Sequence, residues 1–274
     1  DAGADIVVTQ GAVQSNHVRQ TAAAAAKLGM KCHAVLERRV QNVASSYETT
    51  GNVLFDHMFG ATMEFRPSGL DMNAEAQAVT DSLRAAGNNP YFIPGGGSNE
   101  TGALGYVASA QEILQQIVAL NLDPRCIVVA TGSAGTQAGL VAGFHAHDCD
   151  IPIIGISVRQ PHDVQFENVY WLAVKTAALL TDRPMPRSRV LVDDGYVGPG
   201  YGIPTDGTIA AINLLARHEG ILLDPVYSGK GMAGLIGRIQ TGDIAQDGDV
   251  IFLHTGGAVS LFAYEDQFGS STAP

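Results

Sequence analysis

The sequence is poor in charged residues and in cysteine. Charged residues make up 16% of the 274 positions, and the three cysteines, Cys32, Cys126 and Cys149, are scattered without a CxxC pair. This pattern excludes a disulfide scaffold and a zinc site built on paired cysteines, and a reducing cytoplasm is the expected compartment. No apolar run reaches the length of a membrane-spanning helix, so we expect no membrane partner.

Positive charge is also scarce. Lysine and arginine number 16 against 27 aspartates and glutamates, which gives a formal net charge of −11. A chain with this balance is a poor binder of nucleic-acid phosphates and of anionic membrane surfaces. The eight histidines are dispersed, and no carboxylate completes a metal set beside His145 and His147, so no metal is expected. A small-molecule substrate fits the composition better.

Short apolar runs alternate with helix-like segments along the chain. The runs are apolar throughout, as expected for parallel strands covered on both faces, and their alternation with helices predicts βαβ units of the α/β class. Strands are predicted at residues 5–9, 31–37, 62–66, 91–93, 126–130, 151–158, 189–192, 221–223 and 250–254. Helices are predicted at 15–28, 46–59, 74–86, 100–120, 137–147, 163–180, 206–218 and 231–240. The stretch from Pro94 to Ser98 predicts a boundary between a smaller lobe, 1–97, and a larger lobe, 98–274.

The loop from Thr131 to Thr136 is the most informative local feature. It joins a buried strand to a helix, and its glycines allow the backbone to approach a ligand closely. Amide groups at the start of the next helix carry partial positive charge, so the loop is a candidate phosphate site. No lysine follows the glycines as in a Walker A motif, and the spacing is not that of a dinucleotide-binding GxGxxG fingerprint.

Three further loops follow predicted strands, at the edge where open α/β sheets bind ligands. They are residues 10–17, 225–230 and 255–257. The first contains Gln14, Ser15 and Asn16. A helix cap explains Ser15 or Asn16, but three adjacent polar side chains exceed what one cap needs. The second contains Tyr227, which is either an acid, base or substrate contact or a tyrosine packed at a domain edge.

Taken together, these loops resemble pyridoxal-phosphate enzymes of the tryptophan-synthase β-subunit fold type. The resemblance is greatest to the group that contains aminocyclopropane-carboxylate deaminase, D-cysteine desulfhydrase and L-cysteate sulfo-lyase. It rests on the strings QSNHVRQT from Gln14, TGSAGTQAG from Thr131, DPVYSGKG from Asp224 and HTGG from His254. The resemblance implies a two-lobed, three-layer αβα fold, the cofactor pyridoxal 5'-phosphate, a small amino-acid substrate and a homodimer.

The resemblance also implies a role for each matching residue. Asn16 is expected to bond the phenolic oxygen of the cofactor, and Ser15 to move the proton of the substrate α-carbon. Thr255 and Ser228 are expected beside the ring nitrogen, and Tyr201 and Tyr227 against the substrate. The cofactor phosphate is expected on Thr131, Gly132, Ser133, Ala134, Gly135 and Thr136. The substrate carboxylate is expected on Gln14, Ser15, Asn16 and His17 with neighbouring amides.

The lysine that bonds covalently to the cofactor in this family has no counterpart among Lys27, Lys31, Lys175 and Lys230. In the family it lies in a GNKxRKLE-like segment about two dozen residues before the QSNH string. Asp1 falls inside an αβ unit, so we expect an N-terminal segment to precede it. An inactive form is the alternative.

Position 228 bears on the substrate. The deaminases of this group typically carry glutamate there, whereas this chain has Ser228. The difference favours β-elimination of a sulfur group over ring opening. The run from Leu36 to Arg39 and the segment from Tyr47 to Phe65 resemble the cysteate enzymes, so the expected reaction converts L-cysteate to pyruvate, sulfite and ammonia. D-cysteine desulfhydrase and aminocyclopropane-carboxylate deaminase activities are the alternatives.

Two hypotheses from other classes remain. A Rossmann-like nucleotide enzyme would use the Thr131–Thr136 loop, although no acidic residue lies at the ribose-binding distance. A binding or regulatory protein would keep the cofactor fold without turnover.

Overall fold

The computed structural model describes residues 2–41 and 43–268, which form two compact units. Unit 1 runs up to Gly97 and takes in a second segment that starts at Ala258, and unit 2 runs from Ser98 to Gly257. The larger lobe predicted from the sequence, 98–274, therefore differs from unit 2 at its end. The segment after Ala258 packs with unit 1, where the ring of Tyr264 meets the ring of Tyr47 edge-on with centroids 5.6 Å apart.

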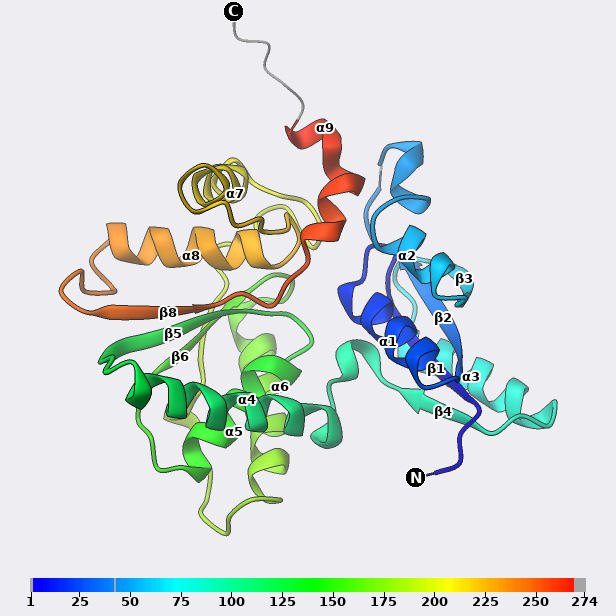
Figure 1. Ribbon diagram of the computed structural model, residues 1–274, viewed down its shortest axis with the longest axis horizontal. Coiled ribbons are helices and arrows are strands. Elements are labelled where there is room, and N and C mark those ends of the chain that lie inside the picture. The colour runs from blue at the N-terminus through cyan, green and yellow to red at the C-terminus, as the bar shows by residue number, and fades with distance from the viewer. Residues whose placement is uncertain (1, 42, 269–274) are drawn as a thin grey trace, which may run out of the picture. The chain divides into compact units, whose positions relative to one another are not determined.

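Unit 1 is a three-layer αβα sandwich (Figure 1). Its elements are β1 (Ile6–Ala12), α1 (Asn16–Lys27), β2 (Lys31–Arg38), η1 (Ser45–Glu48), α2 (Asn52–Met58), β3 (Thr62–Pro67), α3 (Met72–Ala85), β4 (Pro90–Ile93), η2 (Gly95–Gly97), η4 (Ala258–Tyr264) and α9 (Glu265–Phe268). The parallel sheet has the order β3-β2-β1-β4. Successive residues of a strand face opposite sides. Val7 packs with Ala22 of α1, while Val8 packs with Ala76 of α3, so the two helices cover opposite faces.

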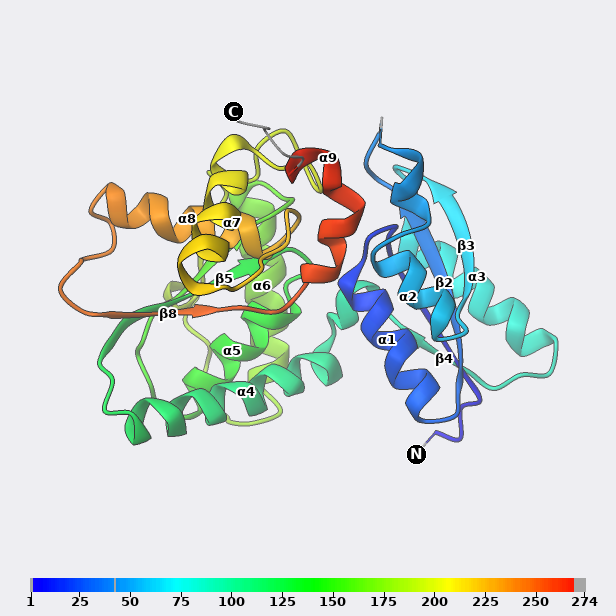
Figure 2. The same ribbon diagram turned by 45° about the horizontal axis from the view of Figure 1, so that its top comes forward.

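Unit 2 has a second parallel sheet, in the order β7-β6-β5-β8. Its elements are α4 (Glu100–Ala119), β5 (Pro124–Thr131), α5 (Gly135–Ala146), β6 (Ile153–Ser157), α6 (His162–Ala177), η3 (Arg187–Arg189), β7 (Leu191–Asp193), α7 (Asp206–Glu219), α8 (Ser228–Gln240) and β8 (Asp249–Leu253). Figure 1 and Figure 2 show α4, α5 and α6 on one face of the sheet and α7 with α8 on the other. The predicted α/β class with parallel sheets is confirmed.

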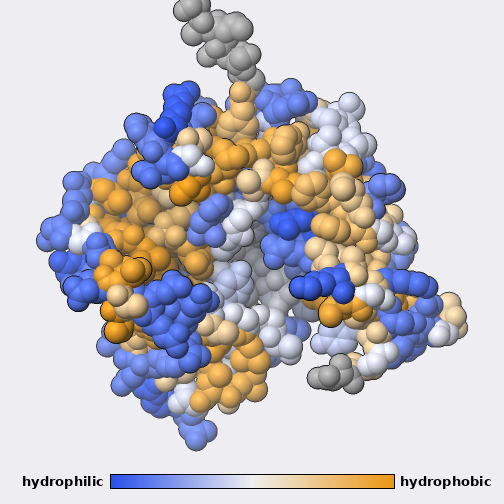
Figure 3. Space-filling model, in the orientation of Figure 1, coloured by the Kyte–Doolittle hydropathy of each residue, from blue (hydrophilic) through white to orange (hydrophobic). Residues whose placement is uncertain are grey.

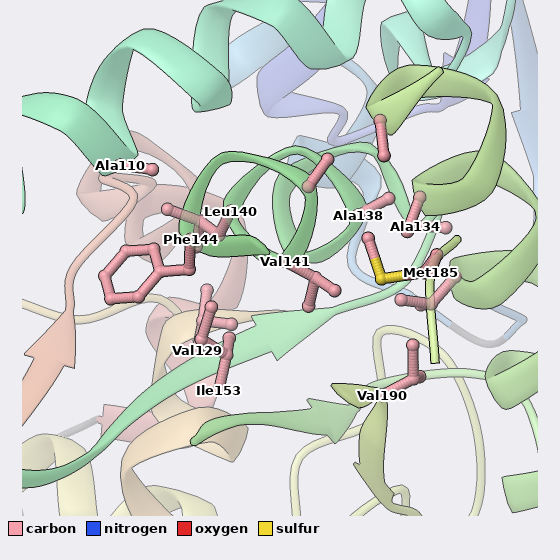
Figure 4. Packing of buried hydrophobic residues seen from close by; sticks show 14 of the residues in the cluster. Ala110, Val129, Ala134, Ala138, Leu140, Val141, Phe144, Ile153, Met185 and Val190 are labelled. Atoms are coloured by element: carbon pink, nitrogen blue, oxygen red, sulfur yellow. The ribbon is translucent and has the colours of Figure 1, made fainter. Parts of the chain in front are cut away.

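The main core of unit 2 lies between β5 and α5. Val129 of β5 and Leu140 of α5 are fully buried, and Phe144 of α5 is 1% exposed (Figure 4). Burying a side chain of this size contributes about 1.5–3 kcal/mol. This packing fixes the axis of α5 on the sheet, and with it the turn that enters the helix.

Two predicted elements are wrong. The helix predicted at 46–59 breaks at Gly51, whose φ of 62° is left-handed, and α2 starts only at Asn52. The strand predicted at 221–223 is an irregular connection between α7 and α8. Ile221 and Leu222 are about half exposed. Figure 3 shows that hydrophobic residues, in orange, reach the surface in several places on the face it draws. The apolar run has no sheet position to fill because α7 packs directly on α8.

Within the described residues, no helix is both long enough and apolar enough to cross a membrane.

The crossing of α4 and α5 generates a stability prediction. A Cβ on Gly139 would lie 2.3 Å from the carbonyl oxygen of Ala103 and 2.7 Å from Cβ of Tyr106. Gly139→Val therefore forces the helices apart, and we expect the free energy of unfolding to fall by about 1–3 kcal/mol in urea denaturation. Gly105→Ala is the control, because that exposed position of α4 has nothing within 4 Å of the added Cβ. It should raise stability by about 0.5–1 kcal/mol, and equal effects of the two changes would contradict the close crossing.

Candidate functional site

The glycine-rich turn of unit 2 leads from the end of β5 at Thr131 into α5 at Gly135. Ala134 before the helix is left-handed, with a φ of 79°, although it is not glycine. Such a backbone costs on the order of 1 kcal/mol and concentrates at functional sites. The amide of Gly135 donates to the hydroxyl of Ser98 at 3.1 Å, which holds the turn against the start of α4.

The hydroxyl groups of the turn divide into two kinds. The Thr131 hydroxyl is buried and accepts a hydrogen bond from the Gln165 side chain at 2.9 Å, so it supports the turn from behind. Ser133 is exposed and Thr136 is half-buried. The first turn of α5 contains no acidic residue. Helix-start amides together with these hydroxyls form a donor set that suits a phosphate.

Tyr227 reaches this turn from the start of α8. A Cβ on Gly132 would lie 2.4 Å from the Tyr227 hydroxyl oxygen, so only glycine leaves room for the phenol. The ring of Tyr201 meets Tyr227 edge-on, with centroids 6.0 Å apart. Three positions predicted separately from the sequence are therefore brought together in unit 2.

A buried carboxylate, Asp224, shapes the start of α8. Its Oδ1 accepts from the amides of Val226 and Tyr227 at 2.9 and 2.7 Å, and its Oδ2 accepts from the Ser228 amide at 2.9 Å and from the Ser228 hydroxyl at 2.6 Å. The Ser228 hydroxyl also accepts from the Asp224 amide at 2.8 Å. Ser228 is 1% exposed, and its hydroxyl belongs to this internal network.

The turn after β8 meets the same edge of the sheet. β8 and β5 are parallel neighbours, so Thr255, just past Leu253, and the turn after Thr131 follow adjacent carboxyl ends. The Ser228 hydroxyl lies 3.4 Å from the carbonyl oxygen of Gly256. Thr255 is half-buried, and with the Ser228 hydroxyl occupied it is the hydroxyl more accessible to a ligand at this edge.

Lys230 anchors the segment that carries Tyr201. The lysine is fully buried, and its Nζ donates to the carbonyl oxygens of Val197 at 2.6 Å and Gly200 at 2.7 Å. Burial lowers the pKa of Lys230 from 10.5 to about 8. The two bonds tie the Tyr201 segment to α8, the helix that begins just after Tyr227.

In unit 1 the strand-to-helix turn after β1 holds Gln14 in a structural position. Its Nε2 donates to the carbonyl oxygens of Tyr47 and Thr50 at 2.6 and 3.0 Å, and its Oε1 accepts from the amide of Asn52 at 2.9 Å. Both amide protons of Gln14 are thereby used. The Gln14 side chain therefore fixes the turn. Carboxylate binding by Gln14 and neighbouring amides stays a prediction.

Ser15 caps α1 by accepting from the Val18 amide at 3.2 Å. A Cβ on Gly11 would lie 2.5 Å from the Ser15 hydroxyl oxygen, so this glycine leaves room for the serine. Asn16 is half-buried, and its Oδ1 accepts from Nδ2 of Asn52 at 3.0 Å. The first turn of α1 also lacks acidic residues, which favours an anion there.

His17 is a neutral, inward-facing residue. Burial lowers its pKa to about 4. The Thr9 hydroxyl donates to the carbonyl oxygen of Ile93 at 3.0 Å, so Nε2 of His17 is the donor in the 2.8 Å contact with that hydroxyl. A neutral ring held in this way supports the turn and supplies no positive charge to a carboxylate.

The other three lysines are exposed. Lys27 ends α1, Lys31 begins β2, and both are exposed. Nζ of Lys175 on α6 lies 3.6 Å from the Glu100 carboxylate. Within the part of the chain that the structure describes, no group of three or more histidine, cysteine, aspartate or glutamate side chains is arranged to hold a metal.

Three residues that hold the turns have no role predicted from the sequence: Asn52, Asp224 and Lys230. The last two stand inside the DPVYSGKG string, so their place in the motif was a usable signal. Asn52 follows Gly51, a glycine inside a predicted helix, and such a glycine marks a possible break.

The chain is similar to proteins of known family and structure. Residues 2–256 match the family described as pyridoxal-phosphate dependent enzymes. The solved structure of an ACC deaminase homologue is similar, with a TM-score of 0.86, 35% identity, and coverage of 97% of this chain and 78% of that one.

Two more distant structures share the fold. One is a hydrogen sulfide-producing enzyme from Fusobacterium nucleatum, with 14% identity, a TM-score of 0.61 and coverage of 94% of this chain and 79% of that one. The other is a threonine deaminase from T.th., with 17% identity, a TM-score of 0.63 and coverage of 93% and 78%.

Replacement of the buried lysine tests the anchor of the Tyr201 segment. Lys230→Met leaves the carbonyls of Val197 and Gly200 without their donor, and we expect the free energy of unfolding to fall by about 1–3 kcal/mol. Hydrogen exchange should accelerate at residues 197–202. Lys175→Met, which removes an exposed lysine, should change stability by less than about 0.5 kcal/mol.

Lys230→Met should also change how the free energy of unfolding depends on pH. Burial raises the pKa of the Cys32 thiol to about 12, and this contributes a fall in stability as the pH rises above 9. Between pH 8 and 10.5 the unfolded chain holds a proton on Lys230 that the folded chain has released, so Lys230 contributes a rise in stability with pH in this window. Lys230→Met should lose that part of the slope. A variant whose stability depends on pH between 8 and 10 in the same way as that of the parent protein would contradict the lowered pKa.

Proposed function

This chain belongs to the family of pyridoxal-phosphate dependent enzymes, and on that premise we propose that it is a carbon–sulfur lyase that releases sulfite from L-cysteate. The β-elimination breaks the bond between the substrate β-carbon and sulfur, and sulfur leaves with the electron pair. Water then completes the conversion to pyruvate and ammonia. D-cysteine desulfhydrase and ACC deaminase activities are the alternatives.

The donor set of unit 2 fits the cofactor. The turn at Gly132–Thr136 offers amides and hydroxyls to a phosphate at the start of α5, a helix without an acidic residue in its first turn. Thr255 lies at the same sheet edge and would neighbour the ring nitrogen. From unit 1, Asn16 would bond the phenolic oxygen. Bound pyridoxal phosphate supplies the electron sink that makes the proton on the substrate α-carbon removable.

We assign proton transfer, substrate contact and carboxylate binding to residues described above. Ser15 would help to move the α-carbon proton, because the Val18 amide takes only one of the two lone pairs of its hydroxyl oxygen and the second can accept a proton. Tyr201 and Tyr227, held edge-on to each other, would face the substrate and exclude water from it. The amides at the start of α1 would bind the substrate carboxylate.

The observation that carries the choice of reaction is the serine at position 228. Its hydroxyl is buried and bonded to Asp224, so this position presents no carboxylate to a ligand. The deaminases of the resembling group typically carry glutamate there. A neutral position supports elimination of a sulfur group over the opening of a cyclopropane ring.

An assay of the complete natural protein with pyridoxal phosphate bound decides the substrate. We expect pyruvate and sulfite to form from L-cysteate, with kcat/KM at least roughly tenfold above that for D-cysteine or aminocyclopropane-carboxylate. Sulfide from D-cysteine, or α-ketobutyrate from the cyclopropane substrate, as the faster reaction would replace the proposal with one of the alternatives. Tight cofactor binding without turnover of any of the three would favour a binding protein.

Ser15→Ala tests the proton-moving role. We expect kcat to fall roughly a hundredfold to ten-thousandfold while the visible absorbance of the bound cofactor persists. The change also removes a helix cap, which costs about 1 kcal/mol. Asp71→Ala is the matched control, because Asp71 caps α3 by accepting from Asn73 and Ala74. It should lose similar stability and keep kcat, and an equal loss of kcat in both variants would contradict the role of Ser15.

Assembly as a homodimer and residence in the cytoplasm are also proposals. Light scattering of the purified protein measures the first. The three cysteines, all free thiols in the structure, are compatible with the second.

A further inference from the structure

Asn52 is a buried residue at the start of α2, and its backbone amide and side chain bond the turn after β1 and the helix α1 that follows it. Its backbone amide donates to Oε1 of Gln14 at 2.9 Å. Its Nδ2 donates to the carbonyl oxygen of Gln14 at 3.3 Å and to Oδ1 of Asn16 at 3.0 Å. Its Oδ1 accepts from Nε of Arg19 at 3.2 Å. Asn52 is 0% exposed, so water does not compete for these bonds.

The direction of this chain of hydrogen bonds follows from its two ends. The guanidinium of Arg19 has only donors, so the atom of Asn52 that faces it is the oxygen. The backbone carbonyl of Gln14 only accepts, so the atom that faces it is the nitrogen. Both ends select the same orientation of the Asn52 amide. The second Nδ2 proton then points at Asn16, which must present Oδ1.

The bond from Asn52 to Oδ1 of Asn16 also determines where the Nδ2 group of Asn16 points. With Oδ1 held by Asn52, Nδ2 of Asn16 is the group left to face a ligand, and it can only donate.

Asp56, one turn along α2 from Asn52, interacts electrostatically with Arg19. Burial raises the pKa of that carboxyl to about 7, while the charge of Arg19 lowers it in part.

We propose that Asn52 is a positioning residue that fixes Asn16 as a hydrogen-bond donor to the phenolate oxygen of pyridoxal phosphate. This inference rests on the proposed function and adds the orientation of the amide to it. An Asn16 amide turned the other way would present its oxygen to the anionic oxygen and would repel it. The donor also stabilises the ionised phenol and so lowers the phenol pKa.

Asn52→Asp is the main test. Cofactor affinity is measured by titrating the protein with pyridoxal phosphate, and the pKa of the cofactor phenol is measured on the saturated protein. The carboxylate still accepts from Arg19 but donates neither to Asn16 nor to Gln14, so Asn16 turns its nitrogen toward residue 52. We expect pyridoxal phosphate to bind roughly tenfold to a hundredfold more weakly. The pKa of the phenol, followed by the visible absorbance of the bound cofactor, should rise by about 1. Asn73→Asp is the control, because Oδ1 of Asn73 only accepts, from Gln10 and Gly95.

A double-mutant cycle separates positioning from a merely structural role. Once Asn16→Ala has removed the donor, adding Asn52→Asp should weaken cofactor binding no further. A double variant clearly weaker than Asn16→Ala would overturn the proposal, as would an Asn52→Asp protein with unchanged affinity and phenol pKa. A parent protein that does not bind pyridoxal phosphate would instead refute the proposed function.

A second variant covers the case in which Asn52→Asp does not fold. Asn16→Asp leaves Asn52 in place. The new carboxylate can still accept the hydrogen bond from Nδ2 of Asn52, but it has no N–H to donate to the cofactor. Asn16 is only half-buried, so the fold should tolerate the change. Affinity should fall by a similar factor, and binding as tight as that of the parent protein would overturn the donor role.

Discussion

The parallel pairing of β5 with both β6 and β8 is the constraint on which the candidate phosphate site of unit 2 depends. Parallel strands end at one edge, so the turns after β5 and β8 are brought together there. The buried face of α5 then holds its N-terminus, and the amides of the turn, at that edge. Tyr227 joins the turn because α8 packs on β5, and Gly132 leaves the space for its phenol.

Buried polar side chains position the loops of the candidate site by bonding to their backbone. Asp224 accepts four hydrogen bonds at the start of α8, and Lys230 donates two to the Tyr201 segment. In unit 1, Gln14 and Asn52 hold the turn after β1. A buried polar group is costly unless it is bonded, so each of these networks specifies one loop conformation. Asn16 and Thr255, which we propose as ligand contacts, are half-buried and so more accessible than these supporting residues.

Much of the fold followed from the sequence alone. Eight of the nine predicted strands are present, because continuous apolar runs between helices have few other arrangements in an α/β protein. The failures have physical causes. Ile221–Leu223 is apolar enough for a strand but connects two packed helices, and Gly51 breaks a helix that the neighbouring residues favour. The segment after Ala258 joins unit 1 through the contact between Tyr47 and Tyr264, a pairing across more than 200 positions that local patterns do not encode.

The sequence by itself determined the α/β class, the position of the glycine-rich turn and the identity of the polar residues in the strand-to-helix loops, because local spacing and helix-start chemistry decide these features. Only the tertiary structure decided which of those residues face inward. Gln14, Thr131 and Ser228 share the residue types of ligand contacts, yet their hydrogen bonds go to segments distant in the chain or to their own helix start. The orientation of Asn16 was decided in the same way, because the partner that sets it, Asn52, lies 36 positions away.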